Sequence, residues 1–163
     1  MSGGMSICSS RIGGTSRLAG KERSHLSIRN SWSNQYIELP NQSLFHEKVR
    51  AIFCQDTYFK NLSCYQEIPV VDIVPGYTAN HRFDWFIDNL NIVIELHGNQ
   101  HYHYTNRGNK QYEVAYRDWL KLQLRDRQKK EAAELAGYCY IEIPYKEYER
   151  LNCEKLKTII LGT

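Results

Sequence analysis

Two short apolar runs joined by a tight connection constrain the fold of this chain more than any other feature of its sequence. Residues 82–88 and 91–96 are rich in aromatic and β-branched side chains, and only two residues separate the runs. This pattern predicts an antiparallel β-hairpin. When the runs pair through this short turn, Asp84 lies directly opposite Glu95 on one face of the hairpin.

The pairing of Asp84 with Glu95 has a chemical consequence. Side chains directly opposite each other on antiparallel strands have Cβ atoms roughly 4.5–5.5 Å apart, so two carboxylates there repel unless a cation or a shared proton compensates. A divalent metal ion is the simplest compensation. Acids that face solvent at a sheet edge give the same pattern without an ion, and a different register would separate the two residues.

A polar cluster follows Glu95 at the end of an otherwise apolar strand. His97 falls on the same face of the strand as Glu95, and residues 98–103 add glycine, amide, histidine and tyrosine side chains. Polar groups gathered at the end of a buried strand favour a chemical role over a purely structural one.

Length and composition favour a single globular domain. With 163 residues, 42% of them hydrophobic, the chain has too little material for two independent cores. Residues 1–35 are dominated by Ser, Gly and Arg, which predicts a flexible basic arm ahead of a domain at 36–163. No apolar run approaches the roughly 20 residues of a membrane span, and the N-terminus lacks the apolar core of a secretory signal. We therefore expect a cytoplasmic protein with no membrane partner.

The net charge of +3 is unevenly distributed. The arm holds five basic residues against one acidic residue, which leaves the remaining chain with a net charge of −1. Within it, residues 107–130 carry eight basic groups against three acids, a local excess that suits a phosphate backbone. A solvated helix face produces the same count.

The spacing of apolar residues predicts an α/β fold with the order α-β-β-β-α-β-α. Ser43 is the expected N-cap of the first helix, and Gly137 the expected stop of the second, in which we expect a bend or break near Arg125. The elements are a helix over 43–57, a strand over 63–70, the hairpin, a helix over 112–136, a strand over 138–143 and a helix over 148–161.

Three segments in this order resemble the PD-(D/E)XK nuclease superfamily. They are residues 83–102, which contain both acids and a Gln-His-Tyr triplet, residues 125–130, which read Arg-Asp-x-x-Lys-Lys, and residues 136–145, which end in Ile-x-Ile-Pro-Tyr. The chain is most similar to the branch that includes very-short-patch repair endonucleases and the related phage and intron homing endonucleases. The resemblance spans about residues 43–145 and implies a restriction-endonuclease-like mixed β-sheet flanked by helices.

The resemblance also implies a metal-dependent DNA endonuclease. Carried onto this sequence, it makes Asp84 and Glu95 the ligands of Mg²⁺, for which Mn²⁺ can substitute. A metal ion held in this way polarises the scissile phosphate and lowers the pKa of an attacking water.

The family usually has a lysine two residues after the second acid, and this chain has His97 there. A neutral imidazole can accept a proton near pH 7. His101, in the Gln-His-Tyr triplet, is the slightly favoured general base and His97 the other candidate. Glu47 is the expected helix glutamate that completes the acidic cluster. The alternatives are histidines without a role and a glutamate on a solvated helix face.

The resemblance and the basic segment together predict the DNA contacts. In the segment 125–130, Asp126 orients the site or a basic partner, with helix capping or pairing as the alternative. Tyrosines interleaved with basic residues suit base stacking, and core packing explains some of them equally well. The expected nucleic-acid-binding residues are Gln100, Arg107, Lys110, Arg117, Arg125, Lys129 and Lys130.

Three classes of function stay open at this point. The favoured one is a Mg²⁺-dependent endodeoxyribonuclease, acting in the cytoplasm of a host cell of a phage or mobile element by analogy with its relatives. A nuclease-fold protein that binds nucleic acid without catalysis is the second, motivated by the missing lysine. The third is an interaction protein whose acidic pair is incidental. Without a recognisable specificity module, specificity is expected to come from the basic N-terminal arm, from loops, or from a homodimer or protein partner.

Overall fold

The computed structural model describes residues 31–104 and 111–162, and within them it has a mixed α/β architecture, as the sequence predicts. The expected order of major elements is confirmed, with three short additions at β1, α3 and α4. The elements are β1 Ser33–Asn34, α2 Leu44–Gln55, β2 Cys64–Pro69, α3 Val70–Ile73, β3 Arg82–Ile87, β4 Ile92–His97, α4 Asn99–Tyr102, α5 Tyr112–Leu135, β5 Cys139–Pro144 and α6 Cys153–Leu161. Most of the predicted basic arm, residues 1–30, lies outside the described residues.

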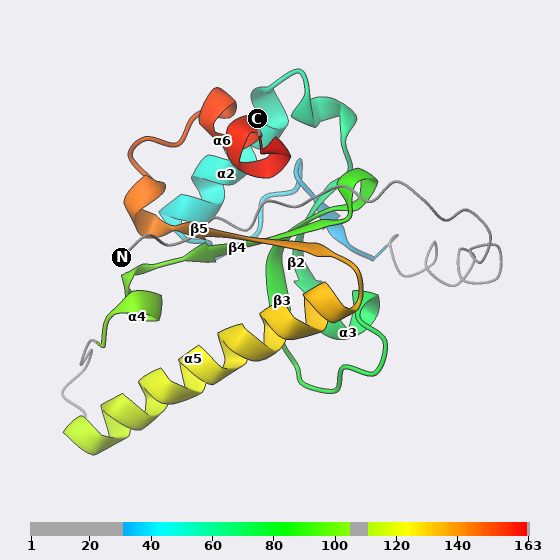
Figure 1. The fold of residues 1–163 in the computed structure, drawn as a ribbon. Coiled ribbons are helices and arrows are strands. Elements are labelled where there is room, and N and C mark those ends of the chain that lie inside the picture. The colour runs from blue at the N-terminus through cyan, green and yellow to red at the C-terminus, as the bar shows by residue number, and fades with distance from the viewer. Residues whose placement is uncertain (1–30, 105–110, 163) are drawn as a thin grey trace.

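A five-stranded sheet with the order β1-β2-β3-β4-β5 forms the centre of the domain (Figure 1). The first three pairs of neighbours are antiparallel, and β4 and β5 are parallel. A parallel pair requires a crossover connection, which α4 and α5 provide between β4 and β5. Helices flank the sheet on both faces.

The hairpin has the predicted register but a different turn. Trp85 pairs with Ile94, and Ile87 pairs with Ile92. The connection is a 3₁₀ turn over Asp88–Leu90 followed by Asn91, whose φ of 52° lies in the left-handed region. Asparagine tolerates this conformation better than most residues, which explains a four-residue turn in place of the expected two-residue one.

The two strands of the hairpin separate toward the end that carries the acids. The last β3–β4 pair on that side is Trp85 with Ile94. Beyond it, Phe83 pairs only with Ile68 of β2, whereas β4 continues its pairing with β5 through His97. This divergence makes a fork in the sheet, and Asp84 and Glu95 are the first residues inside it.

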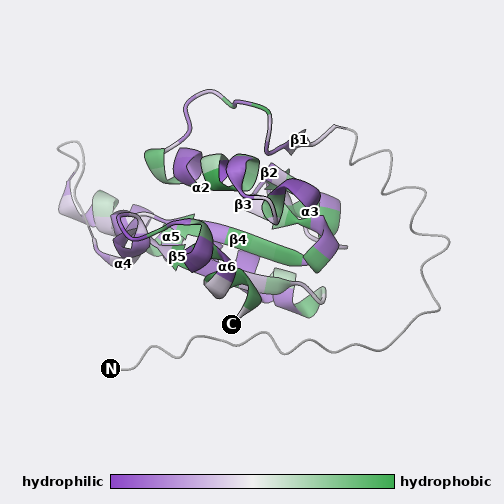
Figure 2. Ribbon diagram, turned by 90° about the horizontal axis from the view of Figure 1, so that it is seen from above, coloured by the Kyte–Doolittle hydropathy of each residue, from purple (hydrophilic) through white to green (hydrophobic). Residues whose placement is uncertain are grey.

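Two hydrophobic clusters hold the helices against the sheet. On one face, α2 and α6 pack on the strands through residues such as Phe53, Trp85 and Leu156. On the other face, α3 and the C-terminal part of α5 pack through residues such as Ile73, Phe86 and Ala133. Figure 2 colours β4 largely green, as expected for a strand that is buried on both faces. The site therefore lies on a strand fixed from both sides.

The helix boundaries follow local sequence signals in most places. The Ser43 hydroxyl caps α2 by accepting a hydrogen bond from the His46 amide, as predicted. Helix α5 is continuous, so the bend expected near Arg125 is wrong, and a left-handed Gly137 with φ 91° follows its end. Helix α6 begins later than the expected 148, because a 3₁₀ turn precedes it and Asn152 is its N-cap. None of the described helices combines the length and apolar composition needed to traverse a bilayer.

Candidate active site

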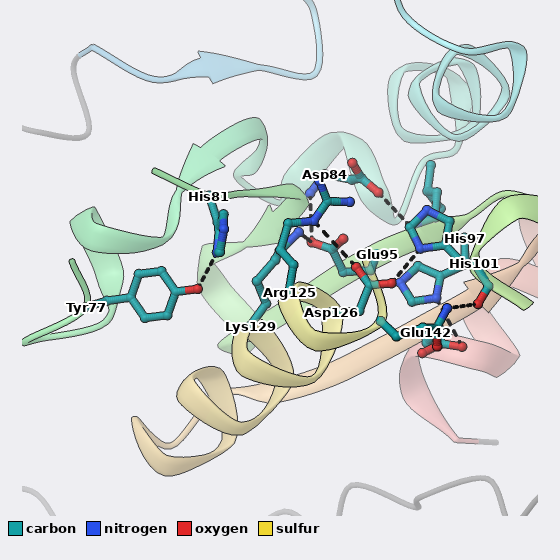
Figure 3. Close-up of polar contacts among 12 residues, drawn as sticks. Tyr77, His81, Asp84, Glu95, His97, His101, Arg125, Asp126, Lys129 and Glu142 are labelled. Carbon is teal, nitrogen blue, oxygen red and sulfur yellow. Dashed lines mark hydrogen bonds and ion pairs between the residues drawn. The ribbon is translucent and has the colours of Figure 1, made fainter. Parts of the chain in front are cut away.

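Asp84 and Glu95 face each other across the fork. There, each carboxylate accepts a hydrogen bond from a backbone amide of the other strand, in place of the carbonyl that would accept it in a regular strand pair. The Leu96 amide donates to Asp84 Oδ2 at 2.6 Å, and the Asp84 amide donates to Glu95 Oε1 at 3.3 Å. Within the described residues, Asp84 Oδ1 and Glu95 Oε2 accept no hydrogen bond, so each acid keeps one oxygen for another ligand. The predicted acidic pair is thus brought together (Figure 3).

The pair belongs to a row of four acids on neighbouring strands. Glu142 of β5 is the direct partner of Glu95, and Glu67 of β2 lies opposite Asp84, between the pairs Gln66–Trp85 and Ile68–Phe83. Glu67 has a φ of 52°, which is an uncommon conformation for a non-glycine residue inside a strand. Strained backbone of this kind is often found at functional sites.

The two glutamates Glu95 and Glu67 of this row have raised pKa values. Burial and the nearby Asp84 carboxylate raise the pKa of Glu95 to about 8, although Lys129 acts in the opposite direction. The same two causes, burial first, raise the pKa of Glu67. Both shifts are the response expected of buried carboxylates that lie close to another acid.

Lys129 of α5 forms a buried ion pair with the acidic site. Its Nζ lies 2.7 Å from Glu95 Oε1, and only 5% of the residue is exposed. The same ammonium group lies 5.5 Å from the centre of the Phe83 ring. The sequence places Lys129 among the DNA contacts, whereas the structure buries it against the acid. Lys129 thus supplies a lysine to the site from α5, whereas β4 has His97 at the position where the nuclease superfamily that the sequence resembles usually has a lysine.

Two histidine–carboxylate pairs lie beside the acids. His101 Nδ1 is 2.6 Å from Asp126 Oδ2, and His97 Nδ1 is 3.3 Å from Glu142 Oε1. The two imidazole rings stack with their centres 4.2 Å apart. The Tyr102 hydroxyl also donates to Glu142.

The carboxylates of these pairs respond to their histidines. The hydrogen bond from His97, assisted by the one from Tyr102, lowers the pKa of Glu142 to about 2 against the effect of burial. Burial acts to raise the pKa of Asp126, but the hydrogen bond from His101 and the positive charges nearby lower it overall. Both carboxylates are therefore ionised at neutral pH and can orient an imidazole.

A cavity of about 230 Å³ opens beside the histidines. His97, His101 and Asp126 contribute to its wall, together with Lys130 and Glu142. His97 is only 3% exposed, and its Nε2 has no hydrogen-bond partner in the described part of the chain. The side chain of His101 is 12% exposed. Of the two histidines, His101 is the more open to a molecule that enters from solvent.

The first helix contributes His46 to the cluster in place of the expected Glu47. The Glu47 carboxylate accepts from Arg50 Nε at 3.0 Å on its own helix, so the structure does not bring it to Asp84. Ligand atoms of His46, Glu67 and Asp84 instead lie within 4.8 Å of one another. His46 also contacts Gln66 Oε1 at 2.9 Å and stacks on Trp85.

The remaining predicted DNA contacts are distributed along α4 and α5. Arg117, Arg125 and Lys130 are exposed on α5, whereas Gln100 of α4 is half-buried and folds back toward Gly98. Arg107 and Lys110 lie outside the described residues. These exposed side chains are accessible to a phosphate backbone, and Arg125 also pairs with Asp126 at 3.8 Å. Their DNA contacts stay a prediction.

Sequence reasoning missed three members of this site, namely His46, Glu67 and Glu142. Glu142 offered a signal, because it is an acid inside an otherwise apolar strand run. Glu67 offered a weaker one of the same kind. His46 could not be distinguished from other polar residues of its helix, since its role depends on the strand that α2 covers.

Comparison of the sequence with known family models, and separately with curated proteins, found no match. The functional argument therefore rests on the residues and on their geometry.

Proposed function

We propose that this protein is a metal-dependent DNA endonuclease whose domain is a variant of the restriction-endonuclease-like fold. The observation that carries the proposal is the fork, at which Asp84 and Glu95 meet beside a buried lysine and a histidine–aspartate pair. This combination supplies acids for a cation, a fixed positive charge and a proton acceptor. Metal-assisted hydrolysis of a phosphodiester bond can use all three.

The acids suit Mg²⁺ for two reasons. Each keeps one carboxylate oxygen without a hydrogen bond among the described residues, and hard oxygen ligands are the ones that Mg²⁺ prefers. Burial, and then the charge of Asp84, raise the pKa values of Glu95 and Glu67, and a divalent cation would offset both effects. When bound, Mg²⁺ polarises the scissile phosphate and acidifies a coordinated water, and Mn²⁺ is the expected substitute.

Lys129 and the His101–Asp126 pair supply the remaining chemistry. The Lys129 ammonium group, fixed by Glu95, stabilises negative charge that develops on the phosphate. Asp126 accepts the Nδ1 proton of His101, which leaves Nε2 as the nitrogen that takes a proton from the attacking water. His97 is less suited to this role because its Nε2 is buried.

DNA is the proposed substrate because exposed basic residues continue from the site along α5. Arg117, Lys121, Arg125 and Lys130 are exposed on this helix. Neutralisation of phosphates by such residues gives affinity without sequence specificity. A homodimer or a protein partner that supplies specificity stays a prediction.

The test is incubation of supercoiled plasmid with the purified protein in Mg²⁺, Mn²⁺ or chelator. The wild type is compared with Asp84→Asn and with Glu131→Gln, which removes an exposed acid of α5 as a matched control. Nicking or linearisation that needs metal, survives in the control and disappears in Asp84→Asn supports the nuclease. Full cleavage by Asp84→Asn would sink the proposal.

The buried ion pair favours one alternative, a nuclease-fold protein that binds nucleic acid without cleaving it. Lys129 already offsets part of the charge of Glu95, which is how a site can persist without a metal ion. This alternative predicts a salt-sensitive mobility shift of DNA with no cleavage of plasmid, mismatched or branched substrates in any metal. Cleavage of any one of these substrates excludes it.

A further inference from the structure

A second group of metal-ligating side chains lies next to the acidic pair. Ligand atoms of His97, His101 and Asp126 lie within 4.8 Å of one another, and all three residues line the cavity described above. Figure 3 shows these side chains meeting between β4 and α5. None of the three is one of the acids assigned to Mg²⁺.

One polar atom in this group is buried with no partner among the described residues. It is Nε2 of His97, on a residue only 3% exposed. Oδ1 of Asp126 also accepts no hydrogen bond there, but Arg125 Nε lies 3.8 Å from it as an ion pair. A buried polar atom left unpaired is costly, so its presence calls for a water, an ion or a ligand. The His97 ring is held in place from its other side, since Nδ1 contacts Glu142 at 3.3 Å. A carboxylate behind a histidine is the usual way in which a metal-binding imidazole is oriented.

The stacked rings place both imidazoles at one part of the cavity wall, with their centres 4.2 Å apart. Metal ions bind the neutral form of histidine, and a divalent ion here would replace the proton shared by His101 and Asp126.

From these observations we propose that His97, His101 and Asp126 form a binding site for a borderline transition-metal ion of the Zn²⁺ class, with Glu142 as the carboxylate that orients His97. Two imidazoles and one carboxylate suit Zn²⁺, whereas Mg²⁺ prefers an all-oxygen site. Three protein ligands leave a fourth position open toward the cavity. The site does not depend on the nuclease proposal, because Zn²⁺ binding is measurable without any substrate.

One consequence does rest on the proposed function. An ion that binds Nδ1 of His101 leaves the proton of the neutral ring on Nε2, so this nitrogen can no longer accept a proton from water. Zn²⁺ added at saturating Mg²⁺ is therefore expected to inhibit cleavage, and this result separates an inhibitory site from a catalytic one.

The direct test is a calorimetric titration of chelator-treated full-length protein with Zn²⁺ alone. We expect one Zn²⁺ site. His97→Ala and Asp126→Asn should each reduce its affinity for Zn²⁺ by more than the roughly 10- to 100-fold that is lost when an outer-shell partner of a metal ligand is removed. Two variants are the matched controls. His103→Ala removes an exposed histidine two residues from His101, and Asp84→Asn disrupts the neighbouring His46–Glu67–Asp84 group. Both are expected to bind Zn²⁺ like the wild type.

Three results would overturn the inference. They are no Zn²⁺ binding tighter than millimolar in the wild type, unchanged binding in both ligand variants, and loss of binding in Asp84→Asn alone. Urea unfolding of each variant checks that it is folded. Asp126→Asn keeps the size of the side chain, so it serves as the decisive variant if His97→Ala does not fold.

Discussion

The repulsion between Asp84 and Glu95 should be measurable as a pH-dependent loss of stability in the metal-free protein. Glu95 is 4% exposed, and burial together with Asp84 raises its pKa from 4.5 to about 8. Because the folded state binds this proton more tightly than the unfolded state, the wild type loses stability as the pH rises from 4.5 to about 8. The Asp84→Asn substitution removes one of the two causes, so the loss should become smaller.

The size of the effect follows from the geometry. Two carboxylates about 5 Å apart repel by about 3 kcal/mol at an effective dielectric constant of about 20. Since Asp84 is half-exposed, solvent screening reduces this energy to about 1–2 kcal/mol. Asparagine still accepts the Leu96 amide through its side-chain oxygen, so little else changes. In chelator, Asp84→Asn should exceed the wild type in unfolding free energy by about 1–2 kcal/mol at pH 9 and by close to zero at pH 6.

Urea unfolding followed by tryptophan fluorescence, in chelator at pH 6 and pH 9, measures this difference. Glu131→Gln is the control, since it removes an acid that is exposed on α5. Saturating Mg²⁺ should reverse the ranking, because an ion at 100 times its dissociation constant adds about 2.7 kcal/mol to the wild type and little to the variant. A difference between Asp84→Asn and the wild type that does not change with pH would refute the reasoning.

Three further predictions concern the neighbours of the pair. Lys129→Met leaves Glu95 without its cation and should cost about 3–5 kcal/mol in urea unfolding at pH 9, with most of the loss recovered in a double variant with Glu95→Gln; an additive double variant would contradict the ion pair. Asp126→Asn should slow plasmid nicking by about 10²- to 10⁴-fold and displace the pH–rate profile, because His101 loses its orienting acid; an unchanged profile removes His101 from the mechanism. Glu67→Gly should raise the unfolding free energy by about 1 kcal/mol, since glycine adopts the positive φ without strain; a less stable variant in the same urea assay would show that the side chain of Glu67 outweighs that strain.

The opposition of Asp84 and Glu95 was the part of the site most accessible from sequence, whereas the fork in the sheet was not predicted. Alternating apolar residues fix which side chains of a hairpin share a face, so the opposition of Asp84 and Glu95 followed from the register alone. The turn that joins the strands was predicted less well, because a left-handed Asn91 allows two more residues into the connection without changing that register. The alternation of apolar residues thus predicted the strand pairing correctly, but it did not predict the length of the turn.

The part of the site on α5 was harder to anticipate. The buried face of this helix includes Asp126 and Lys129 beside Ala133, so polar residues occupy positions where a hydrophobic pattern expects apolar ones. From sequence alone, Lys129 is therefore interpreted as a surface cation. Only the structure shows that it contacts Glu95. Glu142 is similar, because its position beside Glu95 depends on a parallel strand pair that no local signal encodes.

The unbroken course of α5 makes it a rigid lever between the site and the far end of the molecule. At 1.5 Å per residue, about 26 Å separate Tyr112 from Lys129 along the helix axis. Tyr112 and Tyr116 are exposed in its first turns, and their rings stack in parallel. A molecule that binds these rings and tilts the helix must also move Asp126 and Lys129. Binding at the N-terminal end of α5 would therefore change the positions of these two side chains relative to Asp84 and Glu95.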